Sequence, residues 1–534
     1  MKNNIFRYIF IVIFIGLIVF GVYMIYGNQN EDISKEVNTQ KQEEKIIKNI
    51  RLGIANFDTI NPILSNNQSV QNVSKLIYDS LLNITQDYKI QTCLANEVSK
   101  VNATTYLVKL REGVRFSDGT ILEASDVQFT IDKLKQEGVN SIYTNNVRNI
   151  IQVDVVDENT IRIILNEEVP FFEYNLIFPI LSYKYYGQED FLNTNKNNLP
   201  IGTGRFSIIK NDEKSIILKK NNQWWNIQNS NTNLEEIQIN KYSTVSEKYN
   251  EFKAGNIDLL HTTNMNFEQY AGTIGYSVKE FAGKRTDFLA MNTQNNILSN
   301  VEVRQAINFA INKQNIISSI FKDKYHASNF PLDYGNYIYK TDIIKNEYSQ
   351  DNAKSVLIGN GWEYKQNSWR KSINYYQRRI NLNLVVNESN AERTSVAENI
   401  KTQLEDIGIR INIIKSSDAQ YYKYLENKNY DMILTGIYHS NSPDLTAFLG
   451  NNNYSNYYNE EIISILNEIK NITDEKILKE KYERICEIYN TEIPYVMLYH
   501  NSEAVLSNYD LQTSIQANSY NIFYNIENCY RIEK

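Results

Sequence analysis

The chain has 534 residues and a net charge of −7, with 42% hydrophobic and 22% charged residues. Its length allows two to four domains of about 100–200 residues each, and a charge this mild gives no basis for a nucleic-acid partner. Pro (7) and Gly (20) are few while aromatic residues reach 12%. This composition is typical of a globular protein and argues against a disordered one.

An apolar run lies near the N-terminus. Residues 8–26, YIFIVIFIGLIVFGVYMIY, carry no charge and follow Lys2 and Arg7. That length spans a bilayer, and the positive flank predicts the N-terminus inside and the folded part outside. A cleaved signal peptide is the alternative, but no small-residue cleavage site and no lipid-accepting Cys follow the run. We expect residues 1–27 to be a retained membrane anchor and the polar residues 28–48 to be a tether.

The folded part is predicted to begin with a strand, a loop and a helix. Residues 50–54 alternate apolar and polar side chains as a strand does, and residues 70–81 place apolar side chains at helical spacing. Farther on, Tyr106 to Leu110 alternate in the same way, and Asp118–Gly119 has the composition of a tight turn.

A helix is predicted directly after that turn. Ser125 followed three residues later by Gln128 fits a capping box, and Val127, Ile131 and Leu134 continue at helical spacing. A strand, a turn and a capped helix explain the charged residues of this stretch without a catalytic or ion-binding role. We therefore interpret it as scaffold.

The clearest fold signal lies in the C-terminal half. Strands at 380–384, 409–413 and 430–437 alternate with two helices, the first of which stops at Gly408. An order of β-α-β-α-β predicts a parallel α/β lobe. Earlier in the chain, a helix that ends near Gly255 precedes a short strand, which indicates a second lobe built from distant segments.

Ligands of open α/β sheets bind beyond the carboxyl ends of the strands. That rule selects the loops 56–67, 261–264 and 438–446. Two lobes with such loops facing each other would enclose a cleft for a small ligand.

Enzyme motifs are absent from the sequence. There is no HExxH and no GxSxG, and PIGTGRF at 200–206 lacks the third glycine and the Lys-Ser/Thr of a phosphate-binding loop. The four histidines have no metal-ligand spacing. We expect no catalytic activity, no cofactor and no bound metal. Cys486 and Cys529 could form a disulfide, which the sequence alone does not decide.

Several motifs together resemble the family 5 extracellular solute-binding proteins, the receptors of oligopeptide, dipeptide and nickel ABC importers. The similarity extends from about residue 50 to the C-terminus. The motifs that carry it follow the family's order: FDTINPILSNN (57–67), IYDSLLN (77–83), LREGVRFSDGTILEASDVQFT (110–130), LPIGTGRFSI (199–208), LKKNNQWW (218–225), FKAGNIDLL (252–260), NVEVRQAINFAINKQNII (300–317) and TEIPYVMLYHNSEAVLSN (491–508).

The resemblance implies a two-lobed periplasmic-binding-protein-like α/β fold (cluster C) with an inserted extra subdomain. The chain would cross between the lobes near residues 288–292 and 499–505. The expected parts are lobe I at 49–72, 196–288 and 500–534, the inserted subdomain at 73–195, and lobe II at 289–499.

The function implied by the resemblance is capture of a peptide or peptide-like solute by closure of two lobes, followed by delivery to ABC permease subunits. The chain would act outside a bacterial cytoplasmic membrane, anchored through residues 8–26. A metal chelate is not excluded as the ligand, since nickel-binding relatives share the fold. The alternative function is a tethered sensor or scaffold without a transport role, because an apolar helix replaces the usual lipid-attached Cys.

The ligand loop departs from the family pattern. Peptide-binding members carry an aspartate here that pairs with the peptide's ammonium group, whereas GIYHSNSPDL (436–445) has Ser440 or Asn441 at that place. An unpaired buried ammonium is costly, so free peptide N-termini are disfavoured unless Asp444 or Asp58 takes the role. Ile437 replaces the family's Trp, and Tyr438 could supply an aromatic wall. The residues expected to line the site are Phe57, Asp58, His261, Tyr438, His439, Ser440, Asn441 and Asp444.

Overall fold

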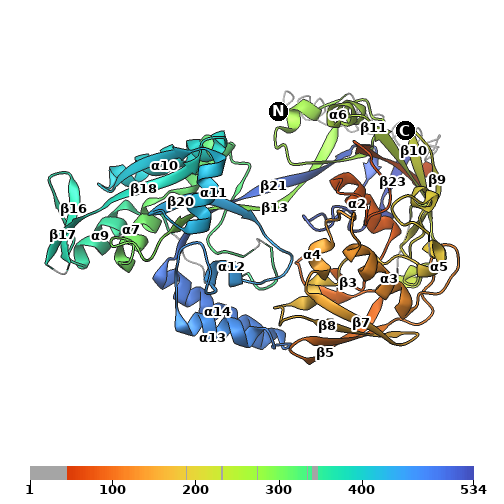
Figure 1. Cartoon of the computed structure of the whole chain (residues 1–534). Coiled ribbons are helices and arrows are strands. Elements are labelled where there is room, and N and C mark those ends of the chain that lie inside the picture. The colour runs from red at the N-terminus through yellow and green to blue at the C-terminus, as the bar shows by residue number, and fades with distance from the viewer. Residues whose placement is uncertain are drawn as a thin grey trace, which may run out of the picture. The chain divides into compact units, whose positions relative to one another are not determined.

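A computed structural model of the protein (Figure 1) describes these residues: 45–187, 189–229, 233–272, 275–332, 335–339, 347–373 and 375–533.

The predicted anchor at residues 8–26 and most of the tether lie outside the described residues. Within those that are described, no helix combines the length and apolarity needed to cross a membrane. The chain divides into a large unit, Lys48–Tyr530, and a small unit made of the two chain ends. In the small unit, β1 (Lys45–Ile47) pairs antiparallel with β23 (Tyr530–Glu533).

The first sheet of the large unit is four-stranded. Its order is β2 (Asn49–Ala55), β11 (Glu236–Tyr242), β10 (Ser215–Lys220) and β9 (Phe206–Asn211), with β2 parallel to β11 and the other pairs antiparallel. The apolar residues that predict the first strand are its buried face, since Ile50, Leu52 and Ile54 are at most 2% exposed.

Helix α2 (Gln68–Ile77) follows this strand and is capped by the Asn67 side chain, which accepts a hydrogen bond from the Ser69 backbone N–H. The helix is shorter than the predicted 70–81. It ends at Ile77 because Tyr78 is extended and the Gly204 N–H donates to the Ile77 carbonyl at 2.9 Å. At Gly204 a Cβ would lie 2.5 Å from the Ile77 carbonyl carbon, so the contact requires glycine.

A second four-stranded sheet is antiparallel, with the order β5 (Ala95–Asn102), β6 (Thr105–Leu110), β8 (Thr160–Leu165) and β7 (Ile150–Asp157). The strand predicted at 106–110 is confirmed as β6. The turn at Asp118 is confirmed too, because the Thr120 N–H donates to Asp118 Oδ1 at 2.9 Å and Gly119 has φ +88°.

The helix predicted after the turn is α3 (Ala124–Lys135), but its predicted cap is wrong. Glu123, and not Ser125, is the N-cap, and Asp126 takes the position that Gln128 was expected to fill. The Asp126 carboxylate accepts from the backbone N–H of Glu123 at 2.8 Å and from that of Tyr183 at 2.7 Å. A buried acid satisfied by two backbone donors fixes the helix start two residues earlier than the Ser–Gln pattern indicates.

The largest sheet is mixed. Strands β18 (Asn381–Asn387), β19 (Arg410–Ser416) and β20 (Met432–Tyr438) are parallel, and α10 (Ala391–Asp406) and α11 (Asp418–Asn427) connect them. The predicted β-α-β-α-β order is thus confirmed. Gly408 follows α10 with φ +87°, which is the conformation that makes glycine the usual residue after a helix.

Two long strands complete this sheet. Strand β13 (Tyr276–Met291) pairs antiparallel with β20 on one side and with β21 (Tyr495–Asn508) on the other (Figure 1). Strand β12 (Leu259–Thr262) pairs with β21. The pairing of β13 with β21 is interrupted between Ala282 and Thr286.

The remaining elements are short strands or helices that cover these sheets. The helices are α4 (Thr144–Val147), α5 (Tyr183–Tyr186), α6 (Val245–Lys253), α7 (Val301–Ala310), α8 (Lys313–Phe321), α9 (Gln350–Gly359), α12 (Thr446–Leu449), α13 (Glu460–Ile469) and α14 (Glu475–Glu492). The strands are β3 (Leu82–Ile84), β4 (Ile90–Thr92), β14 (His326–Ala327), β15 (Glu363–Lys365), β16 (Ser368–Ile373), β17 (Tyr376–Arg379) and β22 (Leu511–Gln512).

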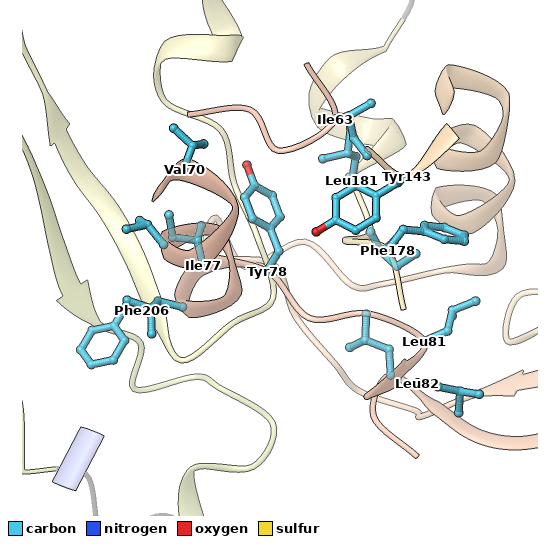
Figure 2. Close-up of a cluster of buried hydrophobic side chains, with 14 of the residues drawn as sticks. Ile63, Val70, Ile77, Tyr78, Leu81, Leu82, Tyr143, Phe178, Leu181 and Phe206 are labelled. Atoms are coloured by element: carbon cyan, nitrogen blue, oxygen red, sulfur yellow. The ribbon is translucent and has the colours of Figure 1, made fainter. Parts of the chain in front are cut away.

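Apolar packing changes along β13 and β21. On one side of the interruption, Val505 belongs to a core whose members range from Ile50 to Cys529. On the other side, Leu289 and Leu498 belong to a second core, whose last member is Tyr499. Figure 2 shows part of the first core, where α2 contributes Val70 and Ile77. Burial of such apolar side chains stabilises each core by about 25 cal/mol per Å².

The cysteines lie in different cores. Cys486 packs with the residues around α14, whereas Cys529 packs in the first core, where its Sγ lies 3.4 Å from Thr513 Oγ1. No disulfide joins the two residues.

A buried ion cluster lies just after the interruption of β13. Asp287 is 0% exposed and accepts hydrogen bonds from Arg393 of α10 at 2.9 and 3.1 Å and from Arg285 at 3.2 Å. The Tyr499 hydroxyl of β21 donates to the same carboxylate at 3.2 Å. Burial raises the pKa of Asp287, but the two arginines outweigh that effect and hold it below the ordinary 3.8.

We expect Asp287→Asn to lower the free energy of unfolding by about 3–5 kcal/mol at pH 7, because it leaves the largely buried Arg393 without its anion and Arg285 with only Glu392 at 3.7 Å. A lowered carboxyl pKa stabilises the fold above the unfolded pKa, and this stabilisation is lost as the pH falls through the folded pKa. The difference between the variant and the wild type should therefore shrink below pH 4, measured by urea unfolding.

Asp154→Asn is the matched control, because it removes an exposed pair with Arg162 at 3.6 Å. It should change the free energy of unfolding by at most about 0.5 kcal/mol. Equal losses in the two variants would refute the role given to Asp287.

Candidate functional site

Two adjoining cavities form the candidate site. The larger cavity has a volume of about 530 Å³ and the smaller one about 320 Å³. Lys75, Tyr143, Ile177 and Tyr520 line both. Lys75 is on α2, Tyr143 directly precedes α4, Ile177 lies in the irregular segment before α5, and Tyr520 lies after β22. The site is thus assembled from distant parts of the chain.

Helix α2 presents a polar stripe to the smaller cavity. Gln68, Gln71 and Lys75 are spaced by three and four residues, which places them on one helix face, and all three line this cavity. Gln71 is buried, and its Nε2 donates to the carbonyls of Pro62 and Ser65 at 2.9 and 2.5 Å. Its Oε1 has no hydrogen-bond partner among the described residues. A buried acceptor left in this state is costly unless a ligand donates to it.

The ammonium group of Lys75 lies 4.0 Å from the centre of the Tyr520 ring, a cation–π contact. Within the described part of the chain, no carboxylate pairs with it. Burial, and then the charge of Lys284, lower the pKa of Lys75 to about 7. Lys75 therefore carries a partial charge at neutral pH, and a bound anion would restore the full charge.

The loop after β20 closes the smaller cavity from another side. Ser440, Asn441 and Ser442 line it, and the Lys284 ammonium donates a hydrogen bond to Asn441 Oδ1. The loop is also held to β13 by the backbone, since the His439 N–H donates to the Lys284 carbonyl at 2.9 Å. At the place where the family's aspartate is expected, this chain thus brings a cation.

The larger cavity has an aromatic wall. The indole N–H groups of Trp224 and Trp225 donate to Asp79 Oδ2 at 3.2 and 2.9 Å, and burial raises the pKa of Asp79 despite these hydrogen bonds. On the same wall, Arg205 and Glu527 form an ion pair.

Tyr78 also lines the larger cavity. Its side chain is 4% exposed, and its hydroxyl has no hydrogen-bond partner among the described residues. Figure 2 shows the Tyr78 ring beside Ile77 of α2 and the Tyr143 ring beside Leu181 and Phe178. The hydroxyl is a second buried polar atom available to a ligand.

The structure places three of the sequence-predicted residues away from these cavities. Phe57 packs beneath the Lys241 ammonium at 4.0 Å, and Asp58 accepts from the Thr59 N–H and the Ser65 hydroxyl at 2.7 and 2.8 Å. His261 Nε2 lies 2.8 Å from Glu503, and this histidine lines a separate cavity of about 30 Å³.

The loop after β20 separates the other predicted residues. Ser440 and Asn441 line the smaller cavity, whereas Tyr438 is 78% exposed. His439 is partly buried and stacks on Phe448, and the desolvation of its ring followed by the charge of Lys284 lowers its pKa to about 3. Asp444 accepts from the Thr446 N–H at 2.8 Å at the start of α12. Two of the eight predicted residues are thus brought together.

Sequence reasoning missed the residues of α2. The available signal was the polar stripe at residues 68, 71 and 75. Most other residues of this helix are buried, so the stripe lies between packed faces of the helix and is not an ordinary solvated face. Tyr143 and Tyr520 lie in irregular segments, where no periodicity marks them.

Two α/β lobes joined by paired strands, with a polar cavity between elements of distant sequence, define the class of two-lobed solute-binding proteins. The model of the bacterial extracellular solute-binding proteins, family 5, matches residues 89–460, well over half of the chain. The chain belongs to this family, and the resemblance stated from its motifs is confirmed.

Heme-binding protein A of Haemophilus influenzae is 25% identical over 365 residues, which are 65% of this chain and 64% of that protein. The match thus spans somewhat less than two thirds of that relative. Oligopeptide-binding protein AppA of Bacillus subtilis is 21% identical over 459 residues, 82% of this chain and 83% of that protein. The solved structure of HbpA2 from Haemophilus parasuis superposes with a TM-score of 0.75 at 20% identity, covering 91% of this chain and 100% of that one. The structural similarity establishes the fold.

We expect Lys75→Met to raise the free energy of unfolding by about 1–3 kcal/mol at pH 6, because it removes a partly buried ammonium that pairs with no carboxylate among the described residues. A lysine pKa lowered on folding penalises the folded state fully below that pKa, and the penalty fades as the pH rises toward 10.5. The gain should therefore be smaller at pH 9 than at pH 6, as measured by urea unfolding.

Lys75→Arg is the matched control, since a guanidinium stays charged and should give no such gain. A Lys75→Met protein less stable than the wild type at pH 6 would contradict the assignment.

Proposed function

We propose that the protein is the substrate-binding subunit of an ABC importer and captures a peptide or peptide-like solute by closure of its two lobes. Membership of the solute-binding family supports this function. The observation that carries it is the smaller cavity, to which α2 of one lobe and the loop after β20 of the other both contribute. A ligand that touches both would draw the lobes together.

The cavities suit a solute of a few residues. Their volumes of about 320 and 530 Å³ lie in the range of small-molecule sites. Gln71 Oε1 and the Tyr78 hydroxyl are buried polar atoms without partners among the described residues, and peptide N–H and C=O groups would satisfy them. The relative named for oligopeptide binding is consistent with a ligand of this general kind.

We further propose that residues 8–26 anchor the protein, with the folded part outside a bacterial cytoplasmic membrane. The apolar run and the preceding Lys2 and Arg7 support this topology. The same anchor favours a second candidate function, a tethered solute sensor, because a receptor dedicated to import in single-membrane bacteria usually has a lipid-attached Cys. Copurification of permease subunits with the protein would support import. If cross-linked membranes repeatedly yielded the protein without permease subunits, the result would support the sensor.

We expect Tyr520→Ala and Asn441→Ala each to weaken solute binding about ten-fold, which is about 1.4 kcal/mol. Both residues line the smaller cavity. The measurement is native mass spectrometry of the full chain, released from detergent, after incubation with a library of randomised tripeptides. Small-angle X-ray scattering should show a smaller radius of gyration for the loaded wild type.

Tyr438→Ala is the control, because this side chain is 78% exposed beside the cavity. It should bind like the wild type. If only Tyr438→Ala weakened peptide binding, the site would lie at the strand end that the sequence favours. If no variant and no wild-type protein bound a peptide, the proposed function would be overturned.

For the anchor, deletion of residues 1–27 should move the protein from the membrane fraction to the soluble exported fraction. N-terminal sequencing of the mature full-length protein should start before residue 27. A mature N-terminus beyond Gly27 would instead establish cleavage.

A further inference from the structure

The small antiparallel sheet of β15, β16 and β17 carries an excess of basic side chains. Residues 363–379 contain five basic residues and one acid, whereas the whole chain has a net charge of −7. Figure 1 shows β16 and β17 projecting as a hairpin beside α9. One face of the hairpin packs on the protein, since Trp369 is 3% exposed and its indole N–H donates to the Ile407 carbonyl at 2.7 Å. The opposite face is open to solvent.

Like charges face each other across this hairpin. The register places Arg370 opposite Arg379 and Lys371 opposite Arg378. Like charges directly opposite each other destabilise an antiparallel pair. Lys371 is paired with Glu302 at 2.8 Å, which offsets its repulsion from Arg378. Arg370 and Arg379 share the solvent face, and an anion placed against them would relieve their repulsion.

Within the described part of the chain, no carboxylate pairs with the three arginines of the hairpin. Arg370 donates to Gln366 Oε1 at 2.6 Å, and its Nε has no hydrogen-bond partner there. The Arg378 guanidinium lies 5.8 Å from the centre of the Tyr376 ring. Arg379 is exposed. A guanidinium group is always charged and forms two parallel hydrogen bonds with a carboxylate or phosphate, so all three side chains can still bind an anion.

The acids of the neighbouring elements do not neutralise these arginines. Glu363 lies across from Arg370 in the sheet but pairs with Lys365. Glu405 and Asp406, at the end of α10, form no ion pair with the hairpin among the residues that the structure describes. The positive charge of the hairpin is therefore not cancelled by these acids.

Tyrosines surround the tip of the hairpin. Tyr375 is fully exposed and has φ +66°, a left-handed conformation that is unusual for a bulky side chain. Tyr376 is 68% exposed and Tyr364 is 51% exposed. An aromatic ring with a hydroxyl group is suited to the interface between lipid headgroups and acyl chains. Arginines directly behind such a tip would lie at the level of the lipid phosphates.

We propose that the β16–β17 hairpin docks on an anionic phospholipid bilayer, with Tyr375 and Tyr376 among the headgroups and with Arg370, Arg378 and Arg379 on the phosphates. Each basic residue close to such a surface strengthens binding about five-fold. The exposed tyrosines favour a bilayer over a soluble polyanion, because a soluble polyanion offers them no apolar layer.

The inference goes beyond the proposed solute-binding function and takes only the nearness of a membrane from the proposed anchor. The tether expected at residues 28–48 spans at most about 75 Å. An anchored chain would thus keep its folded part close to one bilayer, where even weak docking is effective.

The test presents the hairpin to a second membrane. The full chain is incorporated through its anchor into phosphatidylcholine nanodiscs, which are sedimented with vesicles of phosphatidylcholine alone or with added phosphatidylglycerol. We expect sedimentation only with phosphatidylglycerol, and less of it at raised salt, because salt screens exposed charges. Equal sedimentation with both kinds of vesicle would overturn the docking surface. A chain that does not enter nanodiscs would refute the anchor instead, and the same chain is then mixed with the vesicles directly.

The combined substitution Arg370→Gln, Arg378→Gln and Arg379→Gln should weaken vesicle binding at least about ten-fold. Tyr375→Ser with Tyr376→Ser should weaken it as well, at unchanged charge. Binding of the tripeptide library should stay at the wild-type level in both variants, which separates this surface from the proposed solute site. Vesicle binding that survives the loss of the arginines would refute the inference.

The matched control removes three charges from another hairpin. Lys210→Gln, Lys214→Gln and Lys219→Gln lie on the hairpin of β9 and β10, which also carries Asp212 and Glu213. This variant should bind vesicles like the wild type. If it lost as much binding as the arginine variant, the protein would respond to net charge alone and no docking surface would exist.

A fluorescent label on Ser372→Cys tests docking with every arginine and tyrosine in place. Ser372 is exposed on the solvent face of the hairpin, and the three native cysteines are buried. In vesicles that contain phosphatidylglycerol, spin-labelled headgroups should quench this label more strongly than one on Ser464→Cys, an exposed position of α13 near Glu461 and Glu468. Equal quenching would contradict docking. Arginine-dependent binding to polyglutamate or RNA, without binding to vesicles, would overturn the bilayer as the partner.

Discussion

The ion cluster at Asp287 connects the parts of the structure on which the site depends. One carboxylate binds Arg393 of α10 and Arg285 of its own strand, and it accepts from Tyr499 of β21. On the neighbouring strand β20, a Cβ at Gly436 would lie 2.0 Å from Asp287 Oδ1, so only glycine allows the strands to approach this closely. The loop after β20 starts three residues later, at His439, and is therefore fixed at its base.

The charged groups near the loop after β20 determine which groups it presents to a ligand. The Asp287 carboxylate is shared by two arginines, and the ammonium of Lys284, the residue before Arg285, donates to Asn441. The sequence suggested only that an aspartate was absent at Ser440 or Asn441. The structure adds that the Lys284 ammonium lies near that place, where it donates to Asn441 Oδ1.

Elements with strong periodicity could be predicted from the sequence, and the parallel strands and helices between 380 and 438 match closely. The start of α3 was misplaced, because a tertiary hydrogen bond from Tyr183 to Asp126 outweighs the local Ser125 pattern. The strand-end rule selected the loop that holds Ser440 and Asn441, and both residues line the smaller cavity. It could not find Tyr143 or Tyr520, since residues of irregular segments meet only through tertiary packing.

The division of the apolar cores also bears on how the chain acquires its structure. One core is built from a continuous stretch that ends at Tyr499, but the other joins Ile50 to Ile526 and Cys529. Contacts between residues so far apart in sequence form late, because a long loop must close first. The lobe whose strands begin the folded part is thus completed last, after nearly all of the polypeptide has emerged. The site that needs both lobes exists only in the finished molecule.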